Sequence, residues 1–330
     1  MPTTATTSTI DTSAARGAAV LFVTNSHLES FYPVSWLADG GLIGLTLFFC
    51  ISGFGIGKAA STRQQSFPMW YRRRLLRIYP TLWTTLAALS LLLLHKWHAW
   101  SVADYFEQFL YPTQYQFIAK IVVYYVAVYA AVRCERTISA YRLLLITLGL
   151  TAMSALPDMI SLTREPVVLR TGQLNQLFLW LTFLSTTILG LVLAANDRWL
   201  RAPLGFRDLL WSTGLVAAYV GTKLAMSRWA ILPQAFLVYF AAGIGLSVLI
   251  LRVLVQPPDQ PIWRYLYGVR PFLAALGSVS LEMYLVHIQL YQLSLWQRLA
   301  FPFNILTFLV VSLVVSVLIQ RLVRLIPLPK

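Results

Sequence analysis

The chain is a succession of apolar runs, each close to the length that crosses a lipid bilayer. Its 330 residues are 58% hydrophobic and 12% charged, whereas soluble domains carry about 25% charged residues. Only helices and closed barrels satisfy their backbone in lipid, and no alternating strand pattern accompanies these runs. The sequence therefore predicts an all-α polytopic membrane protein with about ten transmembrane helices, near residues 16–36, 41–57, 79–95, 116–133, 142–157, 174–195, 208–223, 230–251, 271–293 and 302–322.

The basic residues alternate between loops and predict an orientation. With the N-terminus in the cytoplasm, 19 of the 26 Lys and Arg residues fall in cytoplasmic segments and seven on the other face. Cytoplasmic loops concentrate Lys and Arg, so this asymmetry favours an even number of spans with a cytoplasmic N-terminus. The same rule accounts for the net charge of +14, and no nucleic-acid partner is expected.

The domain organisation follows from the same pattern. Residues 1–15 are rich in Thr, Ser and Ala and contain no Lys or Arg, unlike a secretory signal. They are predicted to form a disordered cytoplasmic tail, followed by a single transmembrane domain over residues 16–330. Two cysteines and four scattered histidines supply neither a disulfide framework nor a zinc motif, so no metal and no permanently bound cofactor is expected.

The first span is unusually polar for a membrane helix. It carries Asn25, His27 and Glu29, and Arg16 lies eleven residues before His27 on the same helical face. A histidine at membrane depth could simply hydrogen-bond a neighbouring helix, but polar groups there are costly and more often functional. We interpret His27 as a general base, near mid-bilayer, because imidazole titrates near neutrality.

Two further groups of polar residues stand out. Four arginines lie within residues 72–77; they fit either lipid contact at the cytoplasmic border or a clamp for a phosphorylated cofactor. The ninth span carries Glu282, Tyr284 and His287, which fit a polar contact between helices or a role in the site. The glycines of the second span favour close helix packing rather than a nucleotide loop.

Four motifs in order resemble the membrane-bound acyltransferase 3 family. They are Arg16-(ten residues)-His27, Phe48-Phe49-x-x-Ser52-Gly53-Phe54, Arg73-Arg74-Leu75-Leu76-Arg77-Ile78-Tyr79-Pro80 and Ser280-Leu281-Glu282-Met283-Tyr284-Leu285-Val286-His287. The resemblance covers essentially the whole chain after the tail. Family members often carry an Asp three residues before the first arginine, where this chain has Ser13, with Asp11 nearby.

The resemblance implies an O-acyltransferase that moves an acyl group, usually acetyl, from cytoplasmic acyl-CoA to a sugar hydroxyl of a cell-surface or exopolysaccharide glycan. His27 would correspond to the essential histidine, Arg16 to its paired arginine, and Arg74 with Arg77 to the pair that contacts CoA. Expected partners are acyl-CoA as co-substrate, a glycan or lipid-linked oligosaccharide, the lipid bilayer and polysaccharide-assembly proteins. The expected location is the bacterial inner membrane.

Residues and resemblance together give one set of candidate site residues. The catalytic residues are predicted to be His27, Arg16 and Glu282; Arg73, Arg74, Arg77 and Ser52 are expected to bind the donor, and Asn25, Tyr284 and His287 the acceptor. Direct transfer and a transient acyl-histidine both fit this set. A transporter or flippase for lipid-linked sugars is the competing interpretation, since it also needs polar groups at mid-bilayer; a purely structural subunit fits the polar first span least well.

Overall fold

The computed structural model describes residues 10–60, 65–133, 139–156, 176–228, 235–257, 260–261, 263 and 268–327. Within these ranges every regular element is a helix, which confirms the predicted all-α class. The longer helices are α1 (Ser13–Ser26), α2 (Gly41–Ala60), α3 (Phe67–Thr85), α5 (Gln116–Arg133), α6 (Ala140–Ser154), α8 (Gln176–Ala195), α10 (Phe206–Arg228), α11 (Ala235–Leu254), α13 (Val269–Ser278), α14 (Ser280–Leu290) and α15 (Phe303–Arg324).

Short helical segments connect these helices. A π-helical segment, η3 (Leu86–Leu93), extends α3, and π-helical turns are frequent at functional sites. The remaining segments are η1 (Glu29–Phe31), η2 (Ser35–Leu37), η4 (Lys96–His98), α4 (Val102–Phe109), α9 (Arg198–Arg201) and η7 (Ser294–Arg298).

Within the described residues each of the ten predicted spans overlaps a helix, but not every one is a full-length straight span; residues 157, 174–175 and 230–234 of these spans lie outside the described residues. Seven helical segments of the described chain are long and apolar enough to cross a membrane, and the pair α13–α14 makes an eighth if it counts as one span. Helix α6 is shorter, and α1 ends at Ser26 instead of continuing to residue 36 as predicted. Helix α1 begins at Ser13, inside the segment that was expected to belong to the tail.

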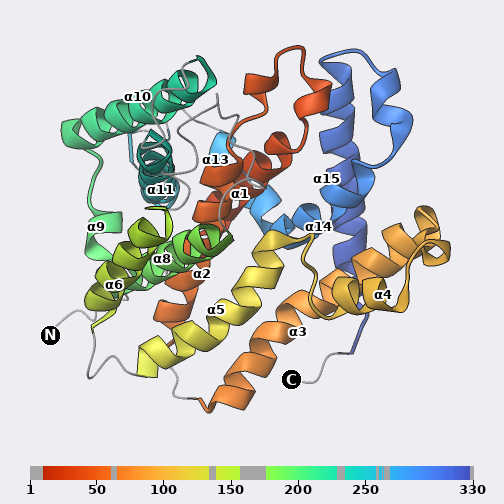
Figure 1. Cartoon of the computed structure of the whole chain (residues 1–330), viewed down its shortest axis with the longest axis horizontal. Helices are drawn as coiled ribbons and strands as arrows, with labels where there is room; N and C mark the ends of the chain where they lie inside the picture. The colour runs from red at the N-terminus through yellow and green to blue at the C-terminus, as the bar shows by residue number, and fades with distance from the viewer. Residues whose placement is uncertain are drawn as a thin grey trace, which may run out of the picture.

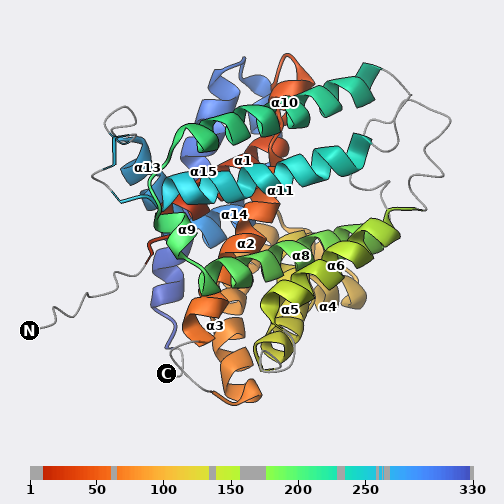
Figure 2. The same ribbon diagram turned by 90° about the vertical axis from the view of Figure 1, so that its left-hand side faces the viewer.

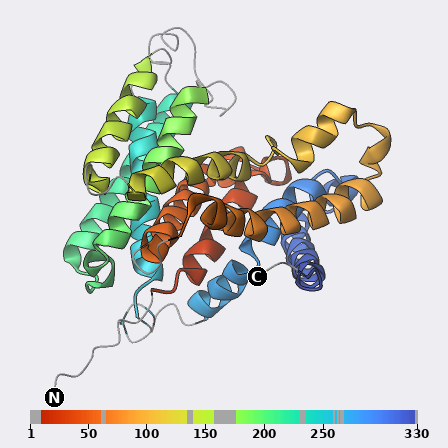
Figure 3. The ribbon, with the colours of Figure 1, turned by 90° about the horizontal axis from the view of Figure 1, so that it is seen from below.

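Helices α1, α2 and α14 lie centrally, and the other helices pack around them in two groups. Helices α10 and α11 run side by side and α6 packs on α8, as Figures 1 and 2 show. Seen from below, these four helices lie on one side of the molecule, while α4 lies at the opposite end (Figure 3). The exposed apolar side chains of α10, such as Leu210 and Trp211, fit contact with lipid, where burial against protein is not needed.

Small residues let α2 and α8 approach closely. A Cβ placed on Gly53 would lie 1.8 Å from the Thr187 carbonyl oxygen, and one on Gly190 would lie 2.1 Å from that of Cys50. Gly53 and Gly57 are four residues apart, the spacing at which small residues form membrane helix contacts. The predicted packing role is thus confirmed for Gly53 and Gly57, whereas Gly55 has no atom within 4 Å of its Cβ position.

A second close contact joins α1 to the broken ninth span. Cβ atoms on Gly17 and Gly277 would lie 1.9 Å and 1.8 Å from the carbonyl oxygens of Leu273 and Ser13, respectively. The span predicted over 271–293 is a broken one, since it bends by 77° between α13 and α14. The bend lets α13 pack along the start of α1 while α14 crosses beneath its end.

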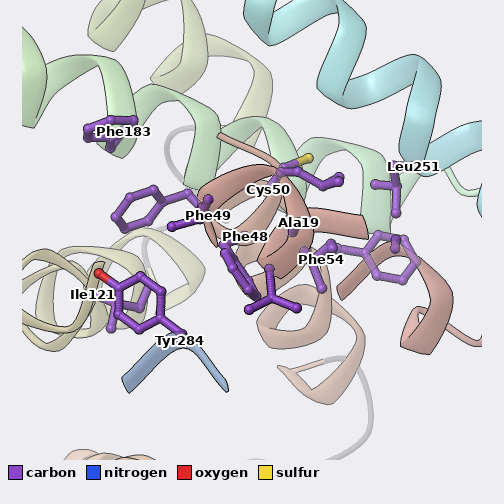
Figure 4. Packing of buried hydrophobic residues seen from close by; sticks show 14 of the residues in the cluster. Ala19, Phe48, Phe49, Cys50, Phe54, Ile121, Phe183, Leu251 and Tyr284 are labelled. Carbon is purple, nitrogen blue, oxygen red and sulfur yellow. The ribbon is translucent and has the colours of Figure 1, made fainter. Parts of the chain in front are cut away.

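Aromatic residues fill the centre where α2, α5, α8 and α14 meet. Phe49 stacks on Phe183 with ring centroids 4.9 Å apart, and Phe48 lies edge-on to Tyr284 at 6.1 Å. Figure 4 shows Phe48 and Phe49 of α2 lying between Phe183 of α8 and Tyr284 of α14. This core ties together the helices that carry the late polar residues.

Candidate active site

His27 lies at the end of α1 and not within a long helix. It is the C-cap residue, and its backbone N–H donates to the Thr24 carbonyl oxygen. Fourteen helical residues extend about 21 Å at about 1.5 Å each, less than the roughly 30 Å of a hydrocarbon core. The helix therefore stops inside the predicted span and leaves His27 exposed on the protein surface.

His287 of α14 lies directly beside His27. The two imidazole ring centroids are 5.2 Å apart, and the rings are tilted by 54°. His287 is fully buried. The structure thus pairs an accessible histidine with an inaccessible one, drawn from opposite ends of the sequence.

The hydrogen bond of His287 defines which of its nitrogens is basic. Nδ1 lies 2.9 Å from the Met283 carbonyl oxygen, one helical turn earlier. A carbonyl oxygen only accepts, so Nδ1 carries the proton and the neutral ring keeps a lone pair on Nε2. That Nε2 is buried and has no hydrogen-bond partner among the described residues. It is therefore a buried hydrogen-bond acceptor beside His27.

The start of α5 holds α14 in place on its other side. The Phe117 backbone N–H donates to the Tyr284 hydroxyl at 3.1 Å, and Gln289 donates to the Tyr115 hydroxyl at 2.6 Å. Tyr284 is buried, and its ring centroid lies 5.9 Å from that of His287. Tyr284 and His287, both predicted acceptor-binding residues, thus share one neighbourhood with His27.

Asn25 anchors the loop that follows α1. Its Nδ2 donates to the carbonyl oxygens of Leu37 and Asp39, both at 2.9 Å, and its Oδ1 accepts from the Tyr32 hydroxyl at 2.6 Å. All the polar atoms of this amide are therefore engaged within the chain. The observed contacts give Asn25 a positioning role for the loop beside His27, in place of a free amide aimed at a substrate.

Arg16 is linked to an acidic residue through a serine. Its Nη2 donates to the Ser13 hydroxyl at 3.3 Å, and that hydroxyl donates to the Asp11 carboxylate at 2.6 Å. The hydrogen bond from the Ser13 side chain holds the pKa of Asp11 below its ordinary value of 3.8. A carboxylate two residues earlier than the family position thus reaches the same arginine by way of Ser13.

The arginine group lies along the first half of α3. Arg74 is half-buried, with its guanidinium 5.3 Å from the Trp70 ring centroid and 5.8 Å from that of Tyr125. Arg73 and Arg77 are exposed. One guanidinium is therefore fixed on aromatic faces, and two others on the same helix remain accessible to an anion.

Two further candidate residues make no described contact with His27. Glu282 is buried, yet the described residues place no cation within ion-pair distance of it. Ser52 of α2 is half-buried. No described contact joins either side chain to His27, and no group of three or more His, Cys, Asp or Glu residues in the described chain could hold a metal ion.

Comparison with known proteins decides the family. The model of the acyltransferase 3 family, described as an acyltransferase domain, matches residues 11–321 of this chain. The chain belongs to the acyltransferase 3 family. No curated protein and no solved structure matches the sequence. The match begins at Asp11 and ends within α15, so it includes every candidate residue.

As a member of this family, the protein is a multi-pass membrane acyltransferase. Several buried polar atoms on the elements around α14 have no partner within the described residues: Thr24 Oγ1 of α1, Thr85 Oγ1 of α3, Ser90 Oγ of η3 and Gln289 Oε1 of α14 itself. Buried polar groups are normally hydrogen-bonded. Such a set suits an interior that receives a polar substrate.

Sequence reasoning about the acyltransferase missed two features of this region. Met283 acts through its backbone carbonyl oxygen, which accepts the hydrogen bond from His287. Every residue has such an oxygen, so the side chain at position 283 could not reveal this role. Lys120 lies within the predicted span 116–133 but was not among the candidate site residues, and it is buried in the first turns of α5. The available signal was its place within an apolar run, because an ionisable residue inside a span is a functional candidate by default.

Proposed function

We propose that this acyltransferase moves an acetyl group, or another short acyl group, from acyl-CoA to a hydroxyl of a cell-surface or exopolysaccharide sugar. The contact between His27 and His287 is the observation that carries the proposal. An exposed imidazole next to a buried lone pair on Nε2 provides a place for the acceptor proton.

The donor would bind at the first half of α3. Arg77 and Arg73 are exposed there, and guanidinium groups match the geometry of the CoA phosphates. Under the expected orientation with the N-terminus in the cytoplasm, this end of α3 faces the compartment that supplies acyl-CoA. The pantetheine arm would then extend inward toward His27.

The chemical step is a nucleophilic attack assisted by a general base. His27 accepts the proton of the acceptor hydroxyl while the oxygen bonds to the thioester carbonyl carbon. The carbon–sulfur bond then breaks, and the departing thiolate takes the proton from the imidazolium, which restores His27 and releases CoA. An acyl-histidine formed on His27 would reach the same products in two steps.

The placement of the protein follows from this scheme. We propose a bacterial inner-membrane location, with a glycan or lipid-linked oligosaccharide as acceptor and polysaccharide-assembly proteins as neighbours. A transporter for lipid-linked sugars would favour matching broken helices in both halves. In the described chain only the α13–α14 pair is broken in this way, which favours the enzyme.

The test uses purified protein in vesicles with radiolabelled acetyl-CoA and a crude lipid-linked glycan extract. His27→Ala should reduce label transfer by about 100- to 10,000-fold, the contribution of a general base. Binding of CoA to the same variant should persist, which shows that the protein remains folded. Turnover that survives His27→Ala would refute the role of His27, and folded wild-type protein with neither CoA binding nor transfer would favour the transporter.

A further inference from the structure

Lys120 is a buried cation that the proposed reaction does not use. It lies in α5, one turn after Gln116, and only 4% of its surface is exposed. Its Nζ lies 5.5 Å from the ring centroid of Trp180 and 5.6 Å from that of Phe183 on α8. The ammonium therefore rests against the faces of two aromatic rings.

The described part of the chain offers this ammonium no anion. The carboxylates found in ion pairs there are Asp39, Asp197 and Asp208, and each is paired with another cation. Lys120 also donates no hydrogen bond to any of the described residues. Contact with ring faces recovers only part of the cost of burying a charge, so a buried ammonium calls for a negatively charged partner.

The surroundings of Lys120 suit a ligand that has both an anionic group and a sugar. Phe117 and Tyr124 lie one turn before and one turn after it on α5, and Phe49 packs against both, with ring centroids at 4.9 Å and 5.5 Å. We call this set, with Trp180 and Phe183, the aromatic wall. Phe117 and Trp180, which are only partly buried, offer ring surface that a sugar can pack against.

The aromatic wall continues directly into the histidine pair. Phe117 donates its backbone N–H to the Tyr284 hydroxyl, and its ring lies 5.8 Å from that of Tyr284. The Tyr284 ring in turn lies 5.9 Å from that of His287. One molecule could therefore contact Lys120 with one part while another part reaches the reactive end of the site.

We propose that Lys120 binds an anionic group of the acyl acceptor, a phosphate or a carboxylate carried by the glycan or by its lipid. This inference rests on the proposed function, because it assigns the chemical class of the acceptor. The charge fixes the acceptor at the aromatic wall, and the sugar hydroxyl then lies toward His27 and His287. The donor phosphates bind separately, at the arginines of α3.

The experiment measures acceptor binding in vesicles without acetyl-CoA, so it does not depend on catalysis. The probes are radiolabelled polyprenyl phosphate and an oligosaccharide that contains a hexuronic acid, each compared with its uncharged counterpart, polyprenol and a neutral oligosaccharide. These pairs distinguish a lipid phosphate from a sugar carboxylate. The variants are Lys120→Met and Lys120→Arg, with Lys96→Met as a control that removes a lysine outside the aromatic wall.

Lys120→Met should weaken binding of one anionic probe by about 30-fold or more, the effect of removing one partner of a buried charge pair. Lys120→Arg keeps the charge and should retain most of the affinity, and Lys96→Met should bind as the wild type does. Equal binding by wild type and Lys120→Met would overturn the proposal, as would a wild type that binds neither anionic probe. If the wild type binds an anionic probe in a manner that depends on Lys120 but shows no acyl transfer, the proposed function is refuted and the role of Lys120 in binding stands.

Discussion

The imidazole rings of His27 and His287 lie 5.2 Å apart although 259 residues separate them in the chain. One ring is exposed and the other is fully buried. The Met283 carbonyl holds the proton of His287 on Nδ1 and leaves Nε2 basic. The relationship places a second imidazole, with a lone pair on Nε2, against the proposed general base.

Replacing His287 should slow the acyl transfer without affecting donor binding. His287→Phe keeps a planar ring in the buried position but removes Nε2, so kcat should fall about 100-fold, the lower end of the range for acid–base groups. Initial rates at varied acetyl-CoA concentration would measure kcat and KM separately. A wild-type kcat in this variant would show that His287 only packs against His27.

Replacing Arg77 should weaken the binding of CoA. Arg77→Ala removes an exposed guanidinium available to phosphate, and loss of one such contact should raise the Kd by about 10-fold. The matched control is Arg72→Ala, which removes an exposed arginine from the same helix outside the Arg74–Arg77 pair. Equilibrium binding of radiolabelled CoA would compare them, and equal loss in both variants would indicate general attraction of charge instead of a specific site.

The contact between α2 and α8 should be sensitive to a single methyl group. Gly53→Ala places Cβ against the Thr187 backbone and should destabilise the protein by about 1–3 kcal/mol. Gly55→Ala, on the same helix with open space around its Cβ, should be neutral or slightly stabilising. Thermal unfolding followed by tryptophan fluorescence would measure both variants, and equal melting temperatures would refute the packing argument.

The contribution of Asp11 to the stability of the folded protein should decrease as the pH falls. The hydrogen bond from Ser13 lowers the pKa of Asp11 in the folded protein below 3.8, so the stabilisation is complete above that ordinary value and is lost as the pH falls through the folded pKa. The difference in melting temperature between wild type and Asp11→Asn should therefore be constant from about pH 5 to 8 and shrink below about pH 4. A difference that grows on acidification would contradict this assignment, and Ser13→Ala should remove most of the effect.

Local patterns in the sequence predicted much of this architecture. The apolar runs placed α5 at its observed bounds and located the other spans, because each helix satisfies its own backbone and its length follows from the bilayer. The predicted end of the first span was wrong, since α1 ends at Ser26 and the chain then turns into a loop with short 3-10 segments, which Asn25 anchors. The break at Val279 was likewise missed, because α13 and α14 together read as one apolar segment.

The helical class, the membrane-spanning character and the identity of the polar residues inside the spans could all be predicted, because these properties depend on composition and on local spacing. Which of those residues meet depends on how the helices pack in three dimensions. Tyr284 and His287 come together with His27 because the 77° bend and the glycine contact between α1 and α13 carry α14 across the end of α1. Lys120 is a candidate binding residue because its ammonium lies against Trp180 and Phe183. These rings approach it only through the packing of α5 against α8. Contacts of this kind depend on the summed packing of many helices, and no spacing within a single helix encodes them.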